Sequence, residues 1–356
     1  MNGFNVDQLL KIFWELPEKD RAVFLRAVMP TAFKEPHAHI ALEQSAEEFL
    51  ASHKDTTKTG RPCCPHCGSF EVVKNGTHGG KQRFLCRNCE KSIGWNTGSI
   101  FNHSKKDMSQ WLKFRDCFLE KKTLRDCAKE CEISLDTAFK WRHKVLDALS
   151  QIHDAIQLDG VVEADETFFA LSYKGARKKF FESLNIKPKD RGEPASLRGL
   201  SKEKICVPCA VTLNGKSTAA VSCRGKPSFK AIEAALSGKI AKNSTLVTDN
   251  HRAYDKLAVV FESLHVPIPR GKRKLGIFNI QLINNYHGQA KRLINGLFRG
   301  VATKYLNNYL VYNNFINFAK ETLKEKCDIF TSFVFTTKVN TKSHEISKRN
   351  PLPLLA

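Results

Sequence analysis

The sequence lacks any continuous apolar run of about 18 residues, the length that a membrane-spanning helix requires. It also lacks an amino-terminal segment in which positive charge is followed by a short apolar stretch, the pattern of a secretory signal. We therefore expect a cytoplasmic protein with no membrane partner. The 12 cysteines are then expected to stay reduced, and to bind metal or pack as small apolar groups instead of forming disulfides.

Negative charge is scarce. Lys and Arg together number 57 against 36 for Asp and Glu, which gives a formal net charge of +21. Between Glu262 and Glu321 the chain has no acidic residue at all. Such a field attracts polyanions wherever the cations cluster, and nucleic acid is the leading candidate partner.

Two Cys-x-x-Cys pairs lie early in the chain, and their spacing is that of a four-thiolate zinc site. The residues between the pairs alternate polar and apolar around glycine turns, which predicts a short hairpin. Residues 59–100 are therefore predicted to form a zinc ribbon, the alternative being cysteines that fill a small core. The expected ligands of a structural Zn²⁺ are Cys64, Cys67, Cys86 and Cys89.

Residues 105–150 predict a helix-turn-helix. Thr123 can cap a short first helix, and Ser134 can cap a longer one that runs from 135 to 149. The alternative is an αα-hairpin with a solvated basic face. The side chains expected to remain free for a DNA groove and its phosphates are Lys140, Arg142, His143 and Lys144.

From residue 158 the pattern changes to strands. Asp165 falls in the middle of a predicted strand with apolar neighbours, a costly position unless a metal or partner neutralises it. Alternation puts Glu163 on the same face as Asp165 and Glu166 on the other, so Glu166 is expected to be structural. Asp249 ends a second predicted strand. Each Asp alone could be a helix cap, but two together favour a divalent cation, Mg²⁺ or Mn²⁺.

The order strand-Asp, hairpin, helix, strand-Asp, basic helix matches a ribonuclease-H-like catalytic domain, which we predict for residues 158–325. Such domains cut and join phosphodiesters with paired carboxylates that hold two metal ions about 3.5–4 Å apart. A third acidic ligand normally lies on a later helix. Here the acid-free stretch after Glu262 removes it.

Several motifs together resemble the zinc-ribbon group of bacterial insertion-sequence transposases over about residues 60–320. They are the ribbon, the helix-turn-helix, Val162–Thr167, Val247–Asp249 and Ile283–Arg292. In that group the third position follows an Asn three residues earlier, and some subgroups carry His or Lys instead of Glu. The resemblance thus implies the catalytic set Asp165, Asp249, Asn284 and His287, with the two aspartates as metal ligands.

Imidazole suits transition ions better than Mg²⁺, so three roles stay open for His287: binding Mn²⁺, contacting a phosphate, or moving a proton. It is otherwise one polar residue on a DNA-facing helix. Asn284 offers its amide oxygen to a metal or its side chain to the DNA backbone.

Further basic segments point to the same partner. Residues 174–204 carry ten Lys or Arg against four Asp or Glu and predict a mobile loop beside the site. Lys291, Arg292 and Arg299 are expected to contact phosphates, which positions a duplex without reading its sequence.

The predicted fold is an α+β multidomain chain: a helical segment at 1–58, the ribbon, the helix-turn-helix, the ribonuclease-H-like domain and a basic tail at 326–356. In this tail, Val334 to Lys348 and the Pro-Leu-Pro end are expected to be disordered. The predicted function is a nucleoid-associated transposase that binds terminal inverted repeats in double-stranded DNA and catalyses cleavage and strand transfer, as a homo-oligomer on paired ends. Two alternatives are an inactive, transposase-derived DNA-binding regulator and a ribonuclease-H-like repair nuclease.

Overall fold

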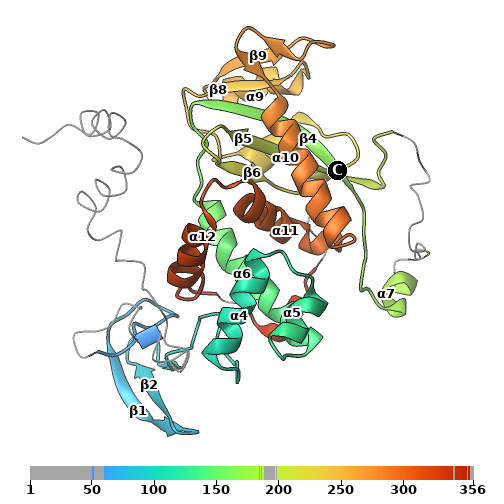
Figure 1. Cartoon of the computed structure of the whole chain (residues 1–356). Coiled ribbons are helices and arrows are strands. Elements are labelled where there is room, and N and C mark those ends of the chain that lie inside the picture. Colours follow the sequence, from blue (N-terminus) through green and yellow to red (C-terminus); the bar gives the residue numbers. More distant parts are fainter. Residues whose placement is uncertain are drawn as a thin grey trace, which may run out of the picture.

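The computed structural model describes residues 50–51, 60–183, 185, 187, 197, 199–339, 341–350 and 352. The predicted helical segment at 1–58 lies outside these residues except for Leu50 and Ala51, as does most of the basic loop between 184 and 198. The described part combines a small sheet, a layer of helices and a larger mixed sheet, in that order in space (Figure 1). None of its helices has the length and apolar character needed to cross a membrane.

The ribbon is a three-stranded antiparallel sheet. Gly79 and Gly80 adopt positive φ at its first turn, a conformation that favours glycine. Its buried core is small, with Phe84 packed edge-on to Trp95 at 5.9 Å between ring centroids. The strands are β1 (Val72–His78), β2 (Lys81–Cys86) and β3 (Ser92–Ile93).

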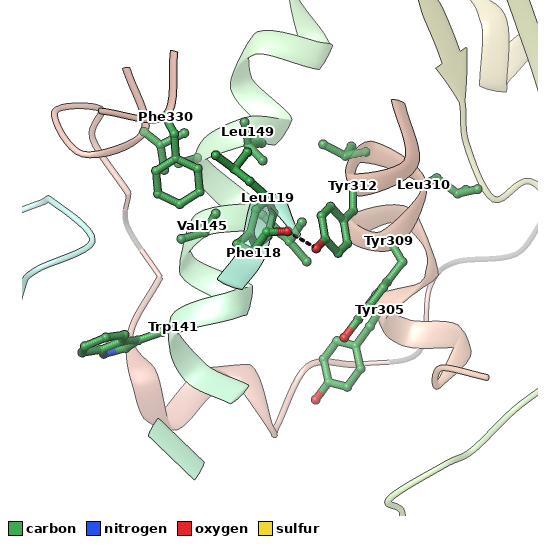
Figure 2. Packing of buried hydrophobic residues seen from close by; sticks show 14 of the residues in the cluster. Phe118, Leu119, Trp141, Val145, Leu149, Tyr305, Tyr309, Leu310, Tyr312 and Phe330 are labelled. Atoms are coloured by element: carbon green, nitrogen blue, oxygen red, sulfur yellow. Dashed lines mark hydrogen bonds between the residues drawn. The ribbon is translucent and has the colours of Figure 1, made fainter. Parts of the chain in front are cut away.

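Three helices follow the ribbon, and the predicted caps are present. The hydroxyls of Thr123 and Ser134 accept hydrogen bonds from the first turns of α5 and α6. Tyr312, from a helix far along the chain, donates a hydrogen bond to the carbonyl of Phe118 in the core around α6 (Figure 2). The helices are α4 (Met108–Leu119), α5 (Leu124–Glu130), α6 (Leu135–Asp154) and the late helix α11 (Leu306–Asn313).

The prediction of a disordered stretch from Val334 to Lys348 is wrong for its described residues. Phe330, Phe335 and Ile346 are fully buried in the core that also contains α4 and α6. Their spacing hides this role, because they lie on short helical pieces instead of one amphipathic helix. The pieces are α12 (Leu323–Ile329), a π-helical turn (Phe330–Val334) and α13 (Ser343–Ile346).

The tail also holds the ribbon. The backbone N–H of Val339 donates to the carbonyl of Gly98 at 2.6 Å. Next to this bond, the rings of Phe101 and Phe335 pack edge-on at 5.1 Å between centroids. We call these two contacts the clasp.

The larger sheet has the order β6-β5-β4-β8-β9, with β7 paired to β5. The strands β6, β5 and β4 are antiparallel, whereas β4, β8 and β9 are parallel. Cys206 and Cys209 lie fully buried in β5. The bounds are β4 (Val161–Ala170), β5 (Lys204–Thr212), β6 (Ser217–Ala219), β7 (Cys223–Arg224), β8 (Thr245–Asp249) and β9 (Leu264–Ile268).

Helices cover both faces of this sheet. Ile232 of α8 and Leu257 of α9 pack with Val162 of β4 on one face. On the other face, Ile283 and Tyr286 of α10 join the core shared with the helical layer, and α10 crosses the sheet (Figure 1). The remaining elements are α7 (Lys178–Ser183), α8 (Phe229–Leu236), α9 (Ala253–Val260), β10 (Lys274–Leu275), β11 (Phe278–Asn279), α10 (Gln281–Lys291), a 3-10 turn (Thr303–Tyr305) and π-helical turns at Arg292–Leu297 and Asn314–Phe318.

Candidate functional sites

The four predicted thiols of the ribbon come together. The Sγ atoms of Cys64 and Cys89 lie 3.6 Å apart, as do those of Cys67 and Cys86. All four sulfurs lie within 4.8 Å of one another. Tetrahedral zinc with bonds of about 2.3 Å requires sulfurs about 3.8 Å apart. The group can therefore bind zinc.

Asp165 and His287 also meet, although they are far apart in the sequence. Asp165 lies on β4 and His287 on α10, and the imidazole Nδ1 is 3.9 Å from the carboxylate Oδ2. Asp249 ends β8, the parallel neighbour of β4, in a register that pairs Thr248 with Ala164. Asp165 therefore lies in the middle of β4, one residue beyond the last pair with β8, beside Asp249 at the end of β8.

The acidic groups of this site crowd one another. Burial, with added repulsion from Glu166 and Asp249, raises the pKa of Asp165 to about 7. Burial also raises the pKa of Glu166 to about 7, and the Asp249 charge adds to it. Glu166 was predicted to be structural from strand alternation, yet its charge is coupled to the site. A cation among these carboxylates would relieve both the burial cost and the repulsion.

The imidazole of His287 is neutral at pH 7, because burial and then Lys291 lower its pKa to about 4. Within the described part of the chain, Nε2 of His287, Oδ1 of Asp249 and Oε1 of Glu166 are buried atoms without a hydrogen-bond partner. These are the donor types that Mg²⁺ and Mn²⁺ accept, with imidazole favouring Mn²⁺. The residues therefore fit a divalent cation. Among the described residues, however, only the ribbon thiols gather three or more potential ligand atoms as closely as 4.8 Å.

Glu163 anchors α10 to β4, a role that the sequence did not reveal. Its carboxylate Oε2 accepts a hydrogen bond from the backbone N–H of Ile283 at 2.9 Å, and Glu163 is only 7% exposed. The N-cap position of α10, Ile280, provides no side-chain cap of its own. Glu163 therefore caps this helix from the strand. Asp165 lies two residues after Glu163 on the same face of β4, and His287 lies about one turn after Ile283 on the same face of α10. The two elements that Glu163 joins therefore also bring Asp165 close to His287.

A hydrogen-bonded chain supports the other aspartate. The His265 ring joins Asp255, at 3.0 Å from Nδ1, to the Thr248 hydroxyl, at 2.9 Å from Nε2. The Thr248 hydroxyl in turn donates to the backbone carbonyl of Asp249 at 2.6 Å. Thr248 is fully buried, so this chain fixes the end of β8 and presents no nucleophile to a substrate.

Asn284 does not reach toward the aspartates. It is exposed on α10, and its side-chain amide donates to the carbonyl of Ile280 at 2.8 Å. Asn284 lies one turn before His287 on α10, as the three-residue spacing requires, but its side-chain amide is hydrogen-bonded within the first turn of its own helix.

The basic residues fall into two groups. Lys291, Arg292 and Arg299 are exposed after α10, as expected for phosphate contacts. Lys140 keeps part of its surface and pairs with Asp136 at 2.5 Å. For Arg142, His143 and Lys144 of α6, the prediction of a solvent-exposed basic face is wrong, because all three are buried.

The interior supplies partners for two of these side chains. Arg142 donates to the carbonyl of Lys122 at 2.5 Å and lies over the Phe298 ring at 5.1 Å. Lys144 donates to the carbonyls of Ile100 and Asn102 at 3.1 and 2.8 Å, which ties α6 to the segment after the ribbon. These side chains satisfy backbone carbonyls and are not available to DNA.

Residues 157–315 match the family model of the ISXO2-like transposase domain. The chain carries an ISXO2-like transposase domain. The resemblance to insertion-sequence transposases is thereby confirmed. The matched segment of this transposase contains β4, β8 and α10, and with them Asp165, Asp249 and His287.

A curated relative points the same way. An uncharacterized protein in transposable element ISH50 of Halobacterium salinarum is 25% identical over 258 residues, which are 69% of this chain and 82% of the relative. A chain in the crystal structure of a pre-cleavage Mos1 transpososome aligns with 61% of this chain and 78% of its own length, at 10% identity and a TM-score of 0.19. That likeness is too low to bear on the fold.

Proposed function

We propose that this transposase binds the terminal inverted repeats of an insertion sequence and catalyses phosphodiester cleavage and strand transfer. The observation that carries the proposal is that His287 contacts Asp165, which lies beside Asp249 of the neighbouring strand, inside the matched domain. The sheet order, with its strand-Asp, hairpin, helix, strand-Asp and basic helix in sequence, supports a ribonuclease-H-like catalytic domain.

Asp165 and Asp249 would hold Mg²⁺ or Mn²⁺, which when bound stabilises the attacking and leaving oxygens of an in-line displacement. Neutral His287 beside Asp165 has an unpartnered Nε2 that can bind the cation or accept a proton from the attacking group. Exposed Lys291, Arg292 and Arg299 would hold the DNA backbone over the site.

Recognition of the element ends would fall to the ribbon, whose four thiols would hold zinc, and to the amino-terminal part of α6, which includes the partly exposed Lys140. The buried remainder of α6 does not take part. Because two ends must be joined, the active form would be a homo-oligomer on double-stranded DNA, associated with the nucleoid.

The deciding experiment is cleavage and joining of DNA that carries the two inverted flanks of the gene, with Mg²⁺ or Mn²⁺. We expect Asp165→Ala and Asp249→Ala to abolish cleavage, and His287→Ala to reduce it at least tenfold. His344→Ala is the matched control, because His344 is exposed on α13, outside the matched domain. Cleavage that survives both Asp substitutions would refute the assignment of the site.

A second candidate is an inactive DNA-binding regulator, and the absence of any acidic residue on α10 favours it. In that case the wild-type protein would retain the flank DNA in a mobility-shift assay but would not cut it with either metal.

A further inference from the structure

A basic hairpin follows β9 and is not used by the function proposed above. Strands β10 and β11 pair through Lys274 with Asn279 and Leu275 with Phe278, so only Gly276 and Ile277 form the turn. Gly276 has a φ of +59°, and Ile277 is not among the residues with positive φ. This is the pattern of a type II′ turn, in which glycine takes the first position and any residue can take the second.

The turn presents an apolar side chain to solvent. Ile277 is 87% exposed, and a two-residue turn leaves it no position within its own hairpin where it could be buried. Single exposed apolar residues need no explanation, but this one belongs to a group. Leu275 of the same hairpin is 42% exposed, and Leu213 and Val161 across the adjoining groove are 67% and 39% exposed.

The groove beside the hairpin has a volume of about 530 Å³, within the size range of small-ligand sites. Its wall combines an aromatic ring with side-chain amides. Flat apolar surface and amide groups are what proteins use to hold a nucleobase, by stacking and by hydrogen bonds to its edges. The residues that bear on this are Phe278, Asn279, Gln281 and Asn285, and Leu213 and Ile277 also line the groove. Among the described residues that line it, the one acidic side chain is Glu163, whose carboxylate accepts the hydrogen bond from Ile283.

The surrounding charge selects a polyanion. Arg270, Lys272, Arg273 and Lys274 are all exposed, and the stretch between Glu262 and Glu321 contains no acidic residue to compensate them. The hairpin also begins close to the proposed catalytic centre. Ile268, the last residue of β9, pairs with Asp249 of β8. DNA held at the aspartates would therefore pass the hairpin.

We infer that the hairpin is a DNA wedge: Ile277 inserts between stacked bases, and the groove beside it receives the base that is displaced. Apolar side chains flanked by cations act in this way in proteins that kink DNA, at a cost of a few kcal/mol per unstacked step. The rigid turn lowers the entropic cost of presenting the wedge. This inference rests on the proposed function, because it places transposon DNA at the site.

The test uses duplexes from the inverted flanks of the gene, with 2-aminopurine at successive positions and without Mg²⁺ or Mn²⁺. We expect severalfold higher fluorescence at one or two adjacent positions on binding of the wild-type protein, and loss of most of this increase with Ile277→Ser. The matched control is Val259→Ser, because Val259 is 78% exposed on α9 and is not on the hairpin. It should behave as wild type, and all three proteins should melt at the same temperature.

A wild-type profile in Ile277→Ser, or no responding position although DNA is bound, would overturn the wedge. If wild type binds and cuts without unstacking any base, the wedge fails and the proposed function stands. If wild type does not retain the duplex at all, both fail. A loss of dimer mass in light scattering with Ile277→Ser, with an unchanged 2-aminopurine profile, would identify the tip as a contact between copies and would also overturn the wedge.

Discussion

Two basic helices of this transposase use their charge in opposite ways. On α6, the cations Arg142 and Lys144 are 1% and 4% exposed and bind backbone carbonyls. After α10, Lys291 and Arg292 stand in solvent. The difference arises because α6 is enclosed by helices from both halves of the chain, whereas α10 packs one face on the sheet. A basic helix is therefore a candidate for DNA binding only if its cationic side chains are exposed to solvent in the folded protein.

The largest expected effect is on stability. Arg142→Ala should lower the free energy of unfolding by about 2–5 kcal/mol, because it leaves a cavity and an unpaired buried carbonyl. Arg292→Ala should change it by less than about 0.5 kcal/mol, as expected at an exposed position. Urea unfolding of the two variants gives the comparison. Equal losses would mean that α6 is not enclosed in solution.

Glu163 tests the side of α10 that faces the sheet. Glu163→Ala should cost about 1–3 kcal/mol, because it leaves the buried N–H of Ile283 unpaired. Glu163→Gln keeps an acceptor oxygen and should restore most of the stability. If the cap also sets the approach of His287 to Asp165, the Ala variant should lower kcat and leave DNA affinity unchanged. An Ala variant with wild-type kcat would show that the cap only stabilises the fold.

His143 gives α6 a dependence on pH. Burial lowers its pKa to about 3 in the folded protein, against about 6.5 when unfolded. Below pH 6.5 the imidazole binds a proton in the unfolded chain but not in the folded protein. The free energy of unfolding therefore decreases as the pH is lowered, by up to about 1.4 kcal/mol per pH unit, until the pH reaches the folded pKa.

We expect His143→Phe to be less sensitive to acid than wild type between pH 6 and about 4. The measurement is the difference between the two unfolding free energies across this range, since buried His153, whose pKa burial lowers to about 4, contributes the same slope to both proteins. Parallel curves would refute a neutral, buried His143.

The smallest effect on stability belongs to the cations after α10. Lys291→Gln with Arg292→Gln should leave the unfolding free energy unchanged and lower the salt dependence of DNA binding by about 2 in log–log slope. Lys242→Gln is the control, because Lys242 is exposed and pairs with Glu262 away from α10. An unchanged slope in the double variant would remove these residues from the DNA interface.

The sequence revealed the elements that local pattern controls. The strand around Asp165, the strand that ends at Asp249 and the two helix caps lie where alternation and capping residues predicted them. The thiol cluster follows from spacing alone. The strands and caps depend on neighbours within a few residues, whereas the thiols that meet are 19 and 25 positions apart and are predicted by the spacing of their two motifs.

What the sequence did not reveal depends on distant partners. The burial of Lys144 depends on carbonyls at 100 and 102, and that of Phe335 on Phe101. The cap from Glu163 depends on a helix that begins at Gln281. None of these pairings leaves a periodic signal. The sequence around Arg142, next to Trp141, is the same whether its side chain contacts solvent or a buried carbonyl, so it does not distinguish the two.

The clasp between Gly98 and Val339 has a consequence for biosynthesis. The ribbon precedes the helical layer in the chain and can fold as soon as its thiols have metal, but the clasp needs a residue that follows the whole matched domain. A chain that stops before Val339 would therefore lack the clasp, and the attachment of the ribbon would depend on the segment that Lys144 binds.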